Sequence, residues 1–167
     1  IAIHPEAGYP SKEWSDERFA ALVQKILLLS DAKIAVVGLG VIARSIALNF
    51  VTSGRVLNLT RCLTLRELAA VLKRCNLFIG NDSGPSHLAQ ALRAPVVVIA
   101  SGTNEYEHWG VWQKPFQVLK YPVACAPCGF ERCKVEGHPC LSGISVDDLL
   151  SAIRNLNGSI LKKSQSQ

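Results

Sequence analysis

A short polar turn between an apolar run and a predicted helix has the residue types of an anion-binding site. The apolar run covers residues 77–79, and the turn covers residues 80–84. Pro85 suits the first turn of the next helix, predicted over residues 86–92, because the N–H that proline lacks would have no partner there. The first N–H groups of this helix and the positive end of its dipole would bind phosphate or another anion.

Single residues of this segment also have ordinary structural explanations. Asp82 or Ser83 could cap the helix, Gly84 could supply the turn, and His87 could be a half-buried side chain without a ligand. The segment as a whole favours a site because it follows a predicted buried strand. In open α/β sheets, ligands bind at the carboxyl ends of the strands.

The hydrophobic pattern predicts the elements that must position this site. Capping residues or apolar stripes indicate helices that begin after Ser15, near Ala43, after Thr64, near Ser86 and after Ser145. Strands are predicted over residues 1–3, 33–37, 56–59, 77–79, 96–100 and 116–120. This alternation predicts an α/β fold with a doubly wound, Rossmann-like parallel sheet. We expect one domain over residues 1–158 and a disordered tail over residues 159–167.

The composition fits one globular domain that binds an anion. A chain of 167 residues with 49% apolar residues can form a full core. The net charge of +5 suits an anionic ligand, but the basic residues are too dispersed and the aromatic residues too few for a nucleic-acid-binding protein. No window has the ~18 apolar residues of a membrane helix. The chain begins on a predicted core strand without methionine, so we interpret it as part of a longer protein.

Two segments resemble a known enzyme family. Residues 82–89, followed by the apolar run 95–99, closely resemble the donor-binding motif of family 9 glycosyltransferases, the bacterial heptosyltransferases that build the lipopolysaccharide core. Residues 3–14 resemble the start of the C-terminal domain of these enzymes, where a proline–glycine turn precedes a lysine and a tryptophan, here Lys12 and Trp14. The resemblance implies the C-terminal, donor-binding half of a two-domain glycosyltransferase of the GT-B type.

The resemblance also implies a donor and partners. The donor would be a nucleotide-diphospho-sugar, typically ADP-heptose, and the acceptor a lipopolysaccharide core sugar at the cytoplasmic face of the inner membrane. An N-terminal half would close over the donor and supply the base for an inverting transfer. We therefore expect no catalytic residue in this chain and no transfer by the chain alone. The family needs no metal ion to bridge the diphosphate, so protein cations and amides would stabilise the leaving group.

Carried over to this sequence, the resemblance assigns a diphosphate site. Lys12 would be the phosphate-binding lysine, and Ser11 could add a hydroxyl hydrogen bond. Ser83, Gly84 and the helix amides would hold the diphosphate as well.

Three further residues complete the expected donor site. Asp82 would hold sugar hydroxyls, and His87 would support the phosphate or the loop. A glycine–threonine loop also follows the fifth strand in the family, so Thr103 could face the donor, although a simple turn explains it equally well.

Two positions depart from the family pattern. Glu6 stands where the family usually has glycine, and a carboxylate there would repel a diphosphate unless it points away or binds sugar hydroxyls. The family usually has a glutamate for the nucleoside ribose shortly after the glycines of the second strand. This chain has residues 42–44, Ile-Ala-Arg, in that neighbourhood.

A rival interpretation is an NAD-type dinucleotide-binding domain. Gly38-Leu39-Gly40 follows a predicted strand and matches the start of the dinucleotide fingerprint. A full strand and helix precede it, however, and the acidic residue expected ~20 positions later is absent from residues 57–59. A nucleotide-binding module without chemistry and a sugar-nucleotide epimerase are two further alternatives.

A cysteine-rich loop over residues 125–140 could hold a metal ion. Cys125, Cys128, Cys133 and Cys140 lie close together in the sequence, and four thiolates suit tetrahedral zinc or iron. Two disulfides or four free thiols are the alternatives, and the cytoplasmic setting of nucleotide-sugar chemistry disfavours disulfides. Some family members have a similar insert, and a related group that glycosylates autotransporters holds iron with four cysteines. The resemblance thus adds a structural zinc or iron ion to the alternatives for these four cysteines, and a catalytic role is not expected.

Overall fold

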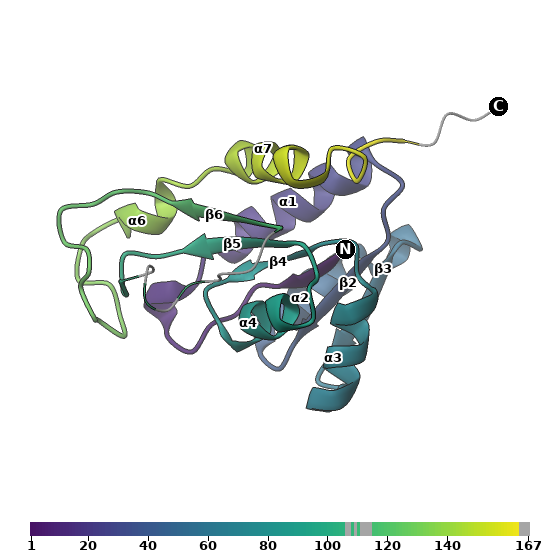
Figure 1. Ribbon diagram of the computed structural model, residues 1–167, viewed down its shortest axis with the longest axis horizontal. Helices are drawn as coiled ribbons and strands as arrows, with labels where there is room; N and C mark the ends of the chain where they lie inside the picture. The colour runs from purple at the N-terminus through teal and green to yellow at the C-terminus, as the bar shows by residue number, and fades with distance from the viewer. Residues whose placement is uncertain (106–107, 109, 111–114, 164–167) are drawn as a thin grey trace.

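The computed structural model describes residues 1–105, 108, 110 and 115–163 (Figure 1). Within these residues a six-stranded sheet forms the centre, in the order β3-β2-β1-β4-β5-β6, and every neighbouring pair is parallel. The strands are β1 (Ala2–His4), β2 (Ile34–Gly38), β3 (Val56–Thr60), β4 (Phe78–Asn81), β5 (Val96–Ala100) and β6 (Phe116–Lys120). This confirms the predicted doubly wound, Rossmann-like fold.

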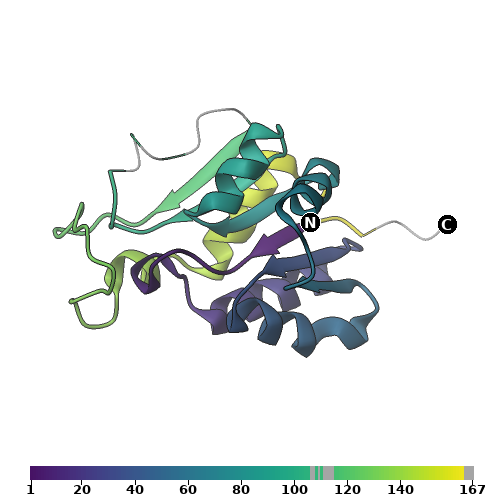
Figure 2. The same cartoon turned by 90° about the horizontal axis from the view of Figure 1, so that it is seen from below.

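Helices cover both faces of the sheet (Figures 1 and 2). One face carries α1 (Asp16–Leu29), α2 (Val41–Phe50) and α7 (Val146–Asn157), and the other carries α3 (Leu65–Arg74) and α4 (Gly84–Ala91). Short helical segments η1 (Pro10–Lys12), η2 (Val51–Ser53) and α6 (Pro139–Ser142) lie in the connections. Successive strand side chains point to opposite faces, so Ile3 packs under α1 whereas its neighbour Ala2 packs with the α3 and α4 side.

Three helices begin at the capping residues that the sequence predicts. The Ser15 hydroxyl accepts a hydrogen bond from the amide of Arg18 at the start of α1. Thr64 with Glu67 and Ser145 with Asp148 each form both hydrogen bonds of a capping box, at the starts of α3 and α7. These bonds satisfy N–H groups that the helix cannot pair internally.

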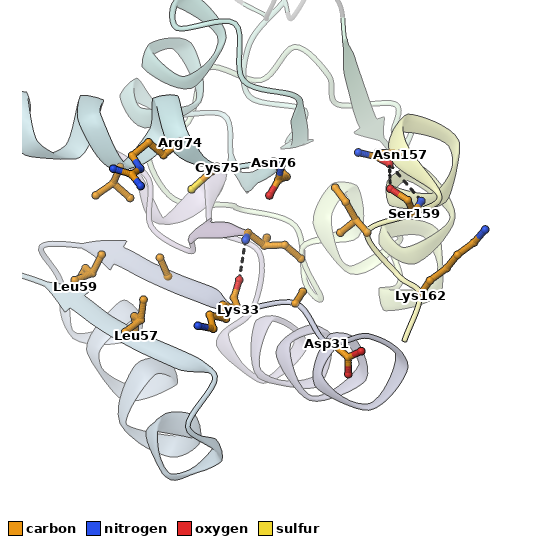
Figure 3. Close-up of a pocket in the computed structure, with 15 residues that line it drawn as sticks. Asp31, Lys33, Leu57, Leu59, Arg74, Cys75, Asn76, Asn157, Ser159 and Lys162 are labelled. Carbon is orange, nitrogen blue, oxygen red and sulfur yellow. Dashed lines mark hydrogen bonds between the residues drawn. The ribbon is translucent and has the colours of Figure 1, made fainter. Parts of the chain in front are cut away.

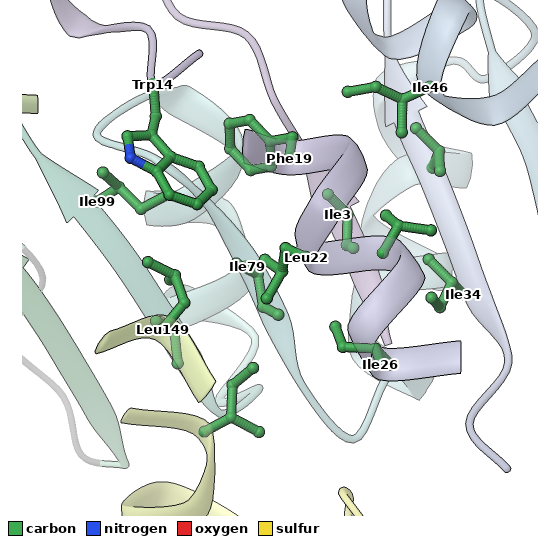
Figure 4. Packing of buried hydrophobic residues seen from close by; sticks show 14 of the residues in the cluster. Ile3, Trp14, Phe19, Leu22, Ile26, Ile34, Ile46, Ile79, Ile99 and Leu149 are labelled. Atoms are coloured by element: carbon green, nitrogen blue, oxygen red, sulfur yellow. The ribbon is translucent and has the colours of Figure 1, made fainter. Parts of the chain in front are cut away.

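A bulky aromatic pair anchors the larger core (Figure 4). Trp14 and Phe19 are fully buried, and their rings meet edge to face with centroids 5.1 Å apart. The Trp14 indole N–H donates to the carbonyl of Ile144, 2.9 Å away, so its one polar atom is satisfied. This packing fixes the chain between β1 and α1 against the C-terminal part of the domain.

The strand order reverses between β1 and β4, which lie side by side in the sheet. β1 leads to β2 on one side, and β4 leads to β5 on the other side. The loops that leave β1 and β4 therefore diverge at their carboxyl ends, where doubly wound folds bind ligands. Residues 159–163 of the expected tail are described, and Ile160 and Leu161 pack against the core. Residues 164–167 lie outside the described residues.

Candidate functional site

Three of the expected donor-site side chains meet at this point of divergence. The ammonium nitrogen of Lys12 lies 2.9 Å from Oδ2 of Asp82, and Nε2 of His87 lies 3.5 Å from Oδ1 of the same carboxylate. The Lys12 and Asp82 side chains are only 13% and 7% exposed, whereas His87 is 43% exposed. Two potential cations thus share one carboxylate, and this group opens to solvent on the His87 side.

The side chain at the end of β4 holds the loop that contains Lys12 through hydrogen bonds to the loop backbone. The buried side chain of Asn81, the last residue of β4, donates to the carbonyl of Pro5 and accepts from the amide of Trp14. These two bonds clamp both ends of the loop that contains Lys12. The hydroxyl of Ser86 donates to the Asn81 carbonyl and ties α4 to the same strand end. Sequence reasoning did not find Asn81, because a polar residue at a strand end has no distinctive pattern.

A cavity of about 260 Å³ lies in front of these side chains. Gly84 begins α4 here, after Ser83 in an extended conformation that forms no side-chain capping bond. Pro85 has no N–H, and the amides of Ser86 and His87 donate to the carbonyl of Ser83. The start of α4 therefore offers the amide of Gly84, which has no partner within the helix, and the positive end of the helix dipole. The residues that line the cavity are Gly8, Tyr9, Lys12, Asp82, Ser83, Gly84, His87 and Asn104.

A second, more apolar cavity of about 430 Å³ adjoins the first one. The two share Gly8, Ser83 and Gly84 as lining residues. Leucine and valine side chains from β2, β3 and α3 form much of its wall, and its polar side chains are His4, Glu6, Arg61, Thr64 and Ser83. An apolar wall with few polar groups suits a flat base and a sugar. The pair of cavities therefore matches a nucleoside followed by phosphates.

The Glu6 carboxylate points toward the start of α2 and does not line the cavity at Lys12. Its Oε2 accepts hydrogen bonds from the amides of Leu39 and Gly40, 3.0 and 2.9 Å away, and its Oε1 accepts from the amide of Ala43 at 3.2 Å. The start of α2 thereby surrounds the carboxylate with N–H donors. The repulsion expected at Glu6 is relieved by these donors and by the α2 dipole.

The same contacts weaken the dinucleotide interpretation. In that interpretation the loop Gly38-Leu39-Gly40 would bind a pyrophosphate, but the Glu6 carboxylate already occupies its amides. A Cβ at Gly40 would lie 2.3 Å from Oε1 of Glu6. Gly38 has φ +147°, a conformation that favours glycine. Both glycines thus have a structural reason that needs no nucleotide.

His4 lines the apolar cavity and lies beside Ser83, which lines both cavities. Its Nδ1 lies 3.4 Å from the hydroxyl of Ser83, and the side chain is buried. Burial lowers the pKa of His4, and the nearby Glu6 offsets part of that shift. The imidazole of His4 therefore carries less positive charge than that of an exposed histidine, and it lies beside the Ser83 hydroxyl.

Ser11 and Thr103 do not join this group. Ser11 is only 2% exposed, and its hydroxyl donates to the carbonyl of Phe130, so it faces the cysteine-rich loop instead of a ligand. Thr103 is buried, accepts from the Ser101 hydroxyl at 2.8 Å and lies behind Ser11. Both residues brace the loops, because the side chains of η1 diverge and only Lys12 reaches the cavity.

The structure adds cavity residues that the motifs did not predict. Gly8 and Tyr9 belong to the opening loop, and its position after β1 was the available signal. Asn104, in the loop after β5, has no such signal in the sequence.

The four cysteines of the loop at 125–140 are free thiols. Burial raises the pKa of the Cys140 thiol, and the nearby thiols of Cys133, Cys125 and Cys128 raise it further. The sulfurs of Cys125, Cys128 and Cys133 thus lie within electrostatic range of Cys140. Within residues 1–105, 108, 110 and 115–163, no three or more His, Cys, Asp or Glu side chains are arranged to hold a metal ion. The donor types fit zinc or iron, but their present positions do not form a ligand shell.

A larger cavity of about 730 Å³ lies at the opposite edge of the sheet (Figure 3). Ile1, Lys33 and Asn76, which come just before β1, β2 and β4, line it. The N-terminal ammonium of Ile1 donates to the Lys33 carbonyl there. This is the amino end of the strands, where open α/β sheets do not bind their ligands, so size alone does not make it the site.

Comparison with known proteins decides the family. The model of glycosyltransferase family 9 (heptosyltransferase) matches residues 1–138, which include both cavities and most of the cysteine-rich loop. The chain belongs to glycosyltransferase family 9. Its Lys12 and its segment 82–87 are therefore parts of a glycosyltransferase domain.

Similar proteins of known name are heptosyltransferases. Lipooligosaccharide heptosyltransferase 2 of Campylobacter jejuni is 29% identical over 103 residues, which cover 61% of this chain and 32% of the relative. Lipopolysaccharide heptosyltransferase 1 of Campylobacter coli is 47% identical over 45 residues, 27% of this chain and 13% of the relative. The chain thus spans about a third or less of the length of these relatives.

Solved structures share the fold. The ADP-heptose lipopolysaccharide heptosyltransferase II of E. coli superposes with a TM-score of 0.74 at 19% identity, over 93% of this chain and 45% of that one. The dodecameric iron-containing heptosyltransferase TibC, in complex with ADP-D-β-D-heptose, superposes with a TM-score of 0.69 at 19% identity, over 96% and 45%. At 19% sequence identity, the structural similarity supports only the assignment of the fold. No helix in the described part of this chain is long and apolar enough to cross a membrane.

Proposed function

We propose that this domain is the donor-binding half of an inverting glycosyltransferase and that it binds ADP-heptose for lipopolysaccharide core synthesis. One observation carries the proposal. Lys12, His87 and the start of α4 surround a polar cavity that continues into an apolar one. This order of environments suits a nucleoside diphosphate that carries a sugar.

In this arrangement the diphosphate lies at the start of α4. The helix amides near Ser83 and Gly84 donate to phosphate oxygens, and Lys12 supplies a charge-assisted hydrogen bond. These groups also stabilise the negative charge that develops on the leaving diphosphate during transfer. No metal ion is needed for this role, because the cations and amides belong to the protein.

Asp82 has two jobs in the proposed complex. Its carboxylate now pairs with Lys12 and lies near His87, which holds both side chains at the cavity. An ionised carboxylate accepts about four hydrogen bonds, so it retains capacity for hydroxyl groups of the donor sugar. The sugar would then lie on the His87 side, where the cavity is open.

We do not assign acceptor binding or the catalytic base to this domain. Inverting transfer needs a base for the acceptor hydroxyl, and both Asp82 and Glu6 are engaged with protein partners. The matched segment covers only 32% of lipooligosaccharide heptosyltransferase 2 of Campylobacter jejuni, which leaves room in such a protein for an acceptor-binding half. We place the acceptor, a lipopolysaccharide core sugar, and the base there, with the enzyme at the cytoplasmic face of the inner membrane. We therefore expect the isolated domain to bind donor but not to transfer sugar.

Amide chemical-shift mapping with ADP tests the proposal. The largest shifts should fall on residues 82–87 and on Lys12, with smaller ones at the wall of the apolar cavity. Adenosine should shift only the amide signals of residues that line the apolar cavity. Shifts with ADP that centre on the cavity at the amino ends of the strands, near Lys33 and Asn76, would refute the assignment.

We also propose that Cys125, Cys128, Cys133 and Cys140 bind one zinc or iron ion with a structural role. The four thiols are chemically suited to such an ion, and they already influence the pKa of Cys140. TibC, which shares the fold, is described as iron-containing. The thiols would have to move together from their present positions to coordinate the ion.

A further inference from the structure

Two helices begin at the carboxyl edge of the sheet on either side of β1, and they differ in what occupies their first amides. At α4, Ser83 and Gly84 line both cavities. At α2, the amides of Leu39, Gly40 and Ala43 all donate to the carboxylate of Glu6. One anion-binding helix start is therefore open to a ligand, and the other is filled by the protein itself.

We propose that Glu6 is a specificity-determining residue that keeps phosphate away from the start of α2. Phosphates can then enter only at α4, so the domain takes a nucleoside diphosphate and rejects dinucleotides, whose pyrophosphate needs the glycine loop. The inference rests on the proposed function only in treating the start of α4 as the phosphate site.

The geometry around Glu6 leaves no room for a second anion. The carboxylate lies so close to the glycine loop that a Cβ on Gly38 would come within 2.6 Å of Oε2 and a Cβ on Gly40 within 2.3 Å of Oε1. A phosphate at these amides would have to displace the carboxylate. If the carboxylate stayed nearby, the two negative charges would repel each other at short range in a partly buried place.

Other charged groups near the loop do not reverse this effect. Arg61 lines the same apolar cavity, but its Nε donates to the carbonyl of Leu39, so the guanidinium is already engaged by the glycine loop. His4 is buried, and burial lowers its pKa, so it adds little positive charge near neutral pH. Lys12 is paired with Asp82 at the other cavity. The dominant charge at the start of α2 is therefore that of Glu6.

The placement of Glu6 also sets the direction of the ligand. A nucleoside in the apolar cavity has α4 on one side and the Glu6 carboxylate on the other, because both Glu6 and Gly84 line that cavity. The phosphate chain leaves toward α4, where the Gly84 amide and the positive end of the helix dipole face the cavity. The reverse orientation would bring phosphates to a carboxylate.

Titration of the amide spectrum with inorganic phosphate tests the inference on the unmodified domain and two variants. In the unmodified domain we expect phosphate to shift the amides of Ser83, Gly84 and His87 and to leave those of Gly40 and Ala43 unchanged. Glu6→Gly removes the carboxylate, so the Gly40 and Ala43 amides should respond to phosphate with at least tenfold higher affinity. Glu6→Gln keeps the side-chain size and one acceptor oxygen but removes the charge, and it should give an intermediate response.

Calorimetry with ADP and NAD⁺ adds a second measure. The ratio of the two affinities should favour ADP in the unmodified domain and fall at least tenfold in Glu6→Gly. A phosphate response at Gly40 in the unmodified domain, or none in either variant, would overturn the inference. If Glu6→Gly does not fold, Glu6→Gln decides the question.

Failure of the proposed function would give a different result. ADP would then leave the amide signals of residues 82–87 and Lys12 unshifted, whatever the response at Gly40.

Discussion

The ammonium of Lys12 and the carboxylate of Asp82 lie 2.9 Å apart although 70 positions separate them in the sequence. Both side chains are largely buried at the diverging loops of β1 and β4. A partly buried pair with one open side can exchange a partner when a ligand arrives. A diphosphate would therefore meet Lys12 already in position, and it would share that cation with Asp82.

Lys12→Ala should weaken the binding of ADP by about tenfold or more, because a hydrogen bond to a charged group contributes about 1.5–3 kcal/mol. Adenosine, which has no phosphate, should bind almost as before. Calorimetric titration of both ligands measures the difference. Lys73→Ala, which changes a lysine in the last turn of α3, serves as the matched control. Equal losses for adenosine and ADP would mean that Lys12 acts through folding.

Asp82→Asn should lower stability and leave the affinity for ADP equal or higher. The variant leaves the partly buried Lys12 without its carboxylate, which we expect to cost about 1–3 kcal/mol, while it removes a negative charge beside the diphosphate. Urea unfolding and calorimetry check the two effects. Asp147→Asn breaks the exposed pair with Lys25 and should cost less than about 1 kcal/mol. Markedly weaker binding of ADP to Asp82→Asn would contradict this charge argument.

The stability of the domain should fall as the pH drops below about 6.5, the ordinary pKa of histidine. Burial lowers the pKa of His4 in the folded domain, so the unfolded chain binds its proton first. The contribution of neutral His4 to the free energy of unfolding is fully present above about pH 6.5, the unfolded-state value. It is lost as the pH falls through the lower folded-state pKa. Urea unfolding at several values between pH 7.5 and 5.5 should show the slope, and His4→Gln should flatten it. An unchanged slope in His4→Gln would assign the effect to other groups.

Thr64→Ala should destabilise the domain by about 1 kcal/mol, the usual cost of losing a helix cap. The Thr64 hydroxyl accepts from the amide of Glu67, and the Glu67 carboxylate accepts in return from the Thr64 amide. The Thr64 hydroxyl also donates to the Glu67 carboxylate, and this bond, together with the one from the Thr64 amide, lowers the pKa of Glu67. The cap should therefore weaken as the pH falls through the range where Glu67 protonates. Thermal unfolding compared with Thr52→Ala, a change in η2, measures the loss. Equal effects of the two changes would argue against the capping role.

The purified domain should contain about one zinc or iron ion per chain if it is prepared without chelator. Removal of the ion should lower the melting temperature, because a metal bound only by the folded state stabilises that state. Elemental analysis and thermal unfolding with and without chelator are the measurements. Cys133→Ser should lose the ion, whereas Cys62→Ser, outside the loop, should keep it. A metal-free domain with all thiols titratable would remove the proposal.

The sequence by itself determined the parts of this protein that depend on near neighbours. Caps such as Thr64 with Glu67 predicted helix starts because both partners lie within one turn. The apolar runs predicted the strands, and their alternation with helices predicted the doubly wound sheet. The polar turn before α4 was predicted for the same local reason, although α4 begins at Gly84, two residues earlier than expected.

Only the tertiary structure decided which side chains share a cavity. Lys12 and Ser11 are adjacent in the sequence, yet Lys12 reaches Asp82 whereas Ser11 donates to Phe130 on a distant loop. Glu6 finds its amide donors at the start of α2 because β1 and β2 are paired, which brings residues 33 to 37 positions apart into contact. These partners come from segments far away along the chain, and local periodicity carries no information on them. The long-range pairing of strands therefore determines the chemistry at the sheet edge, including which helix start remains open to phosphate.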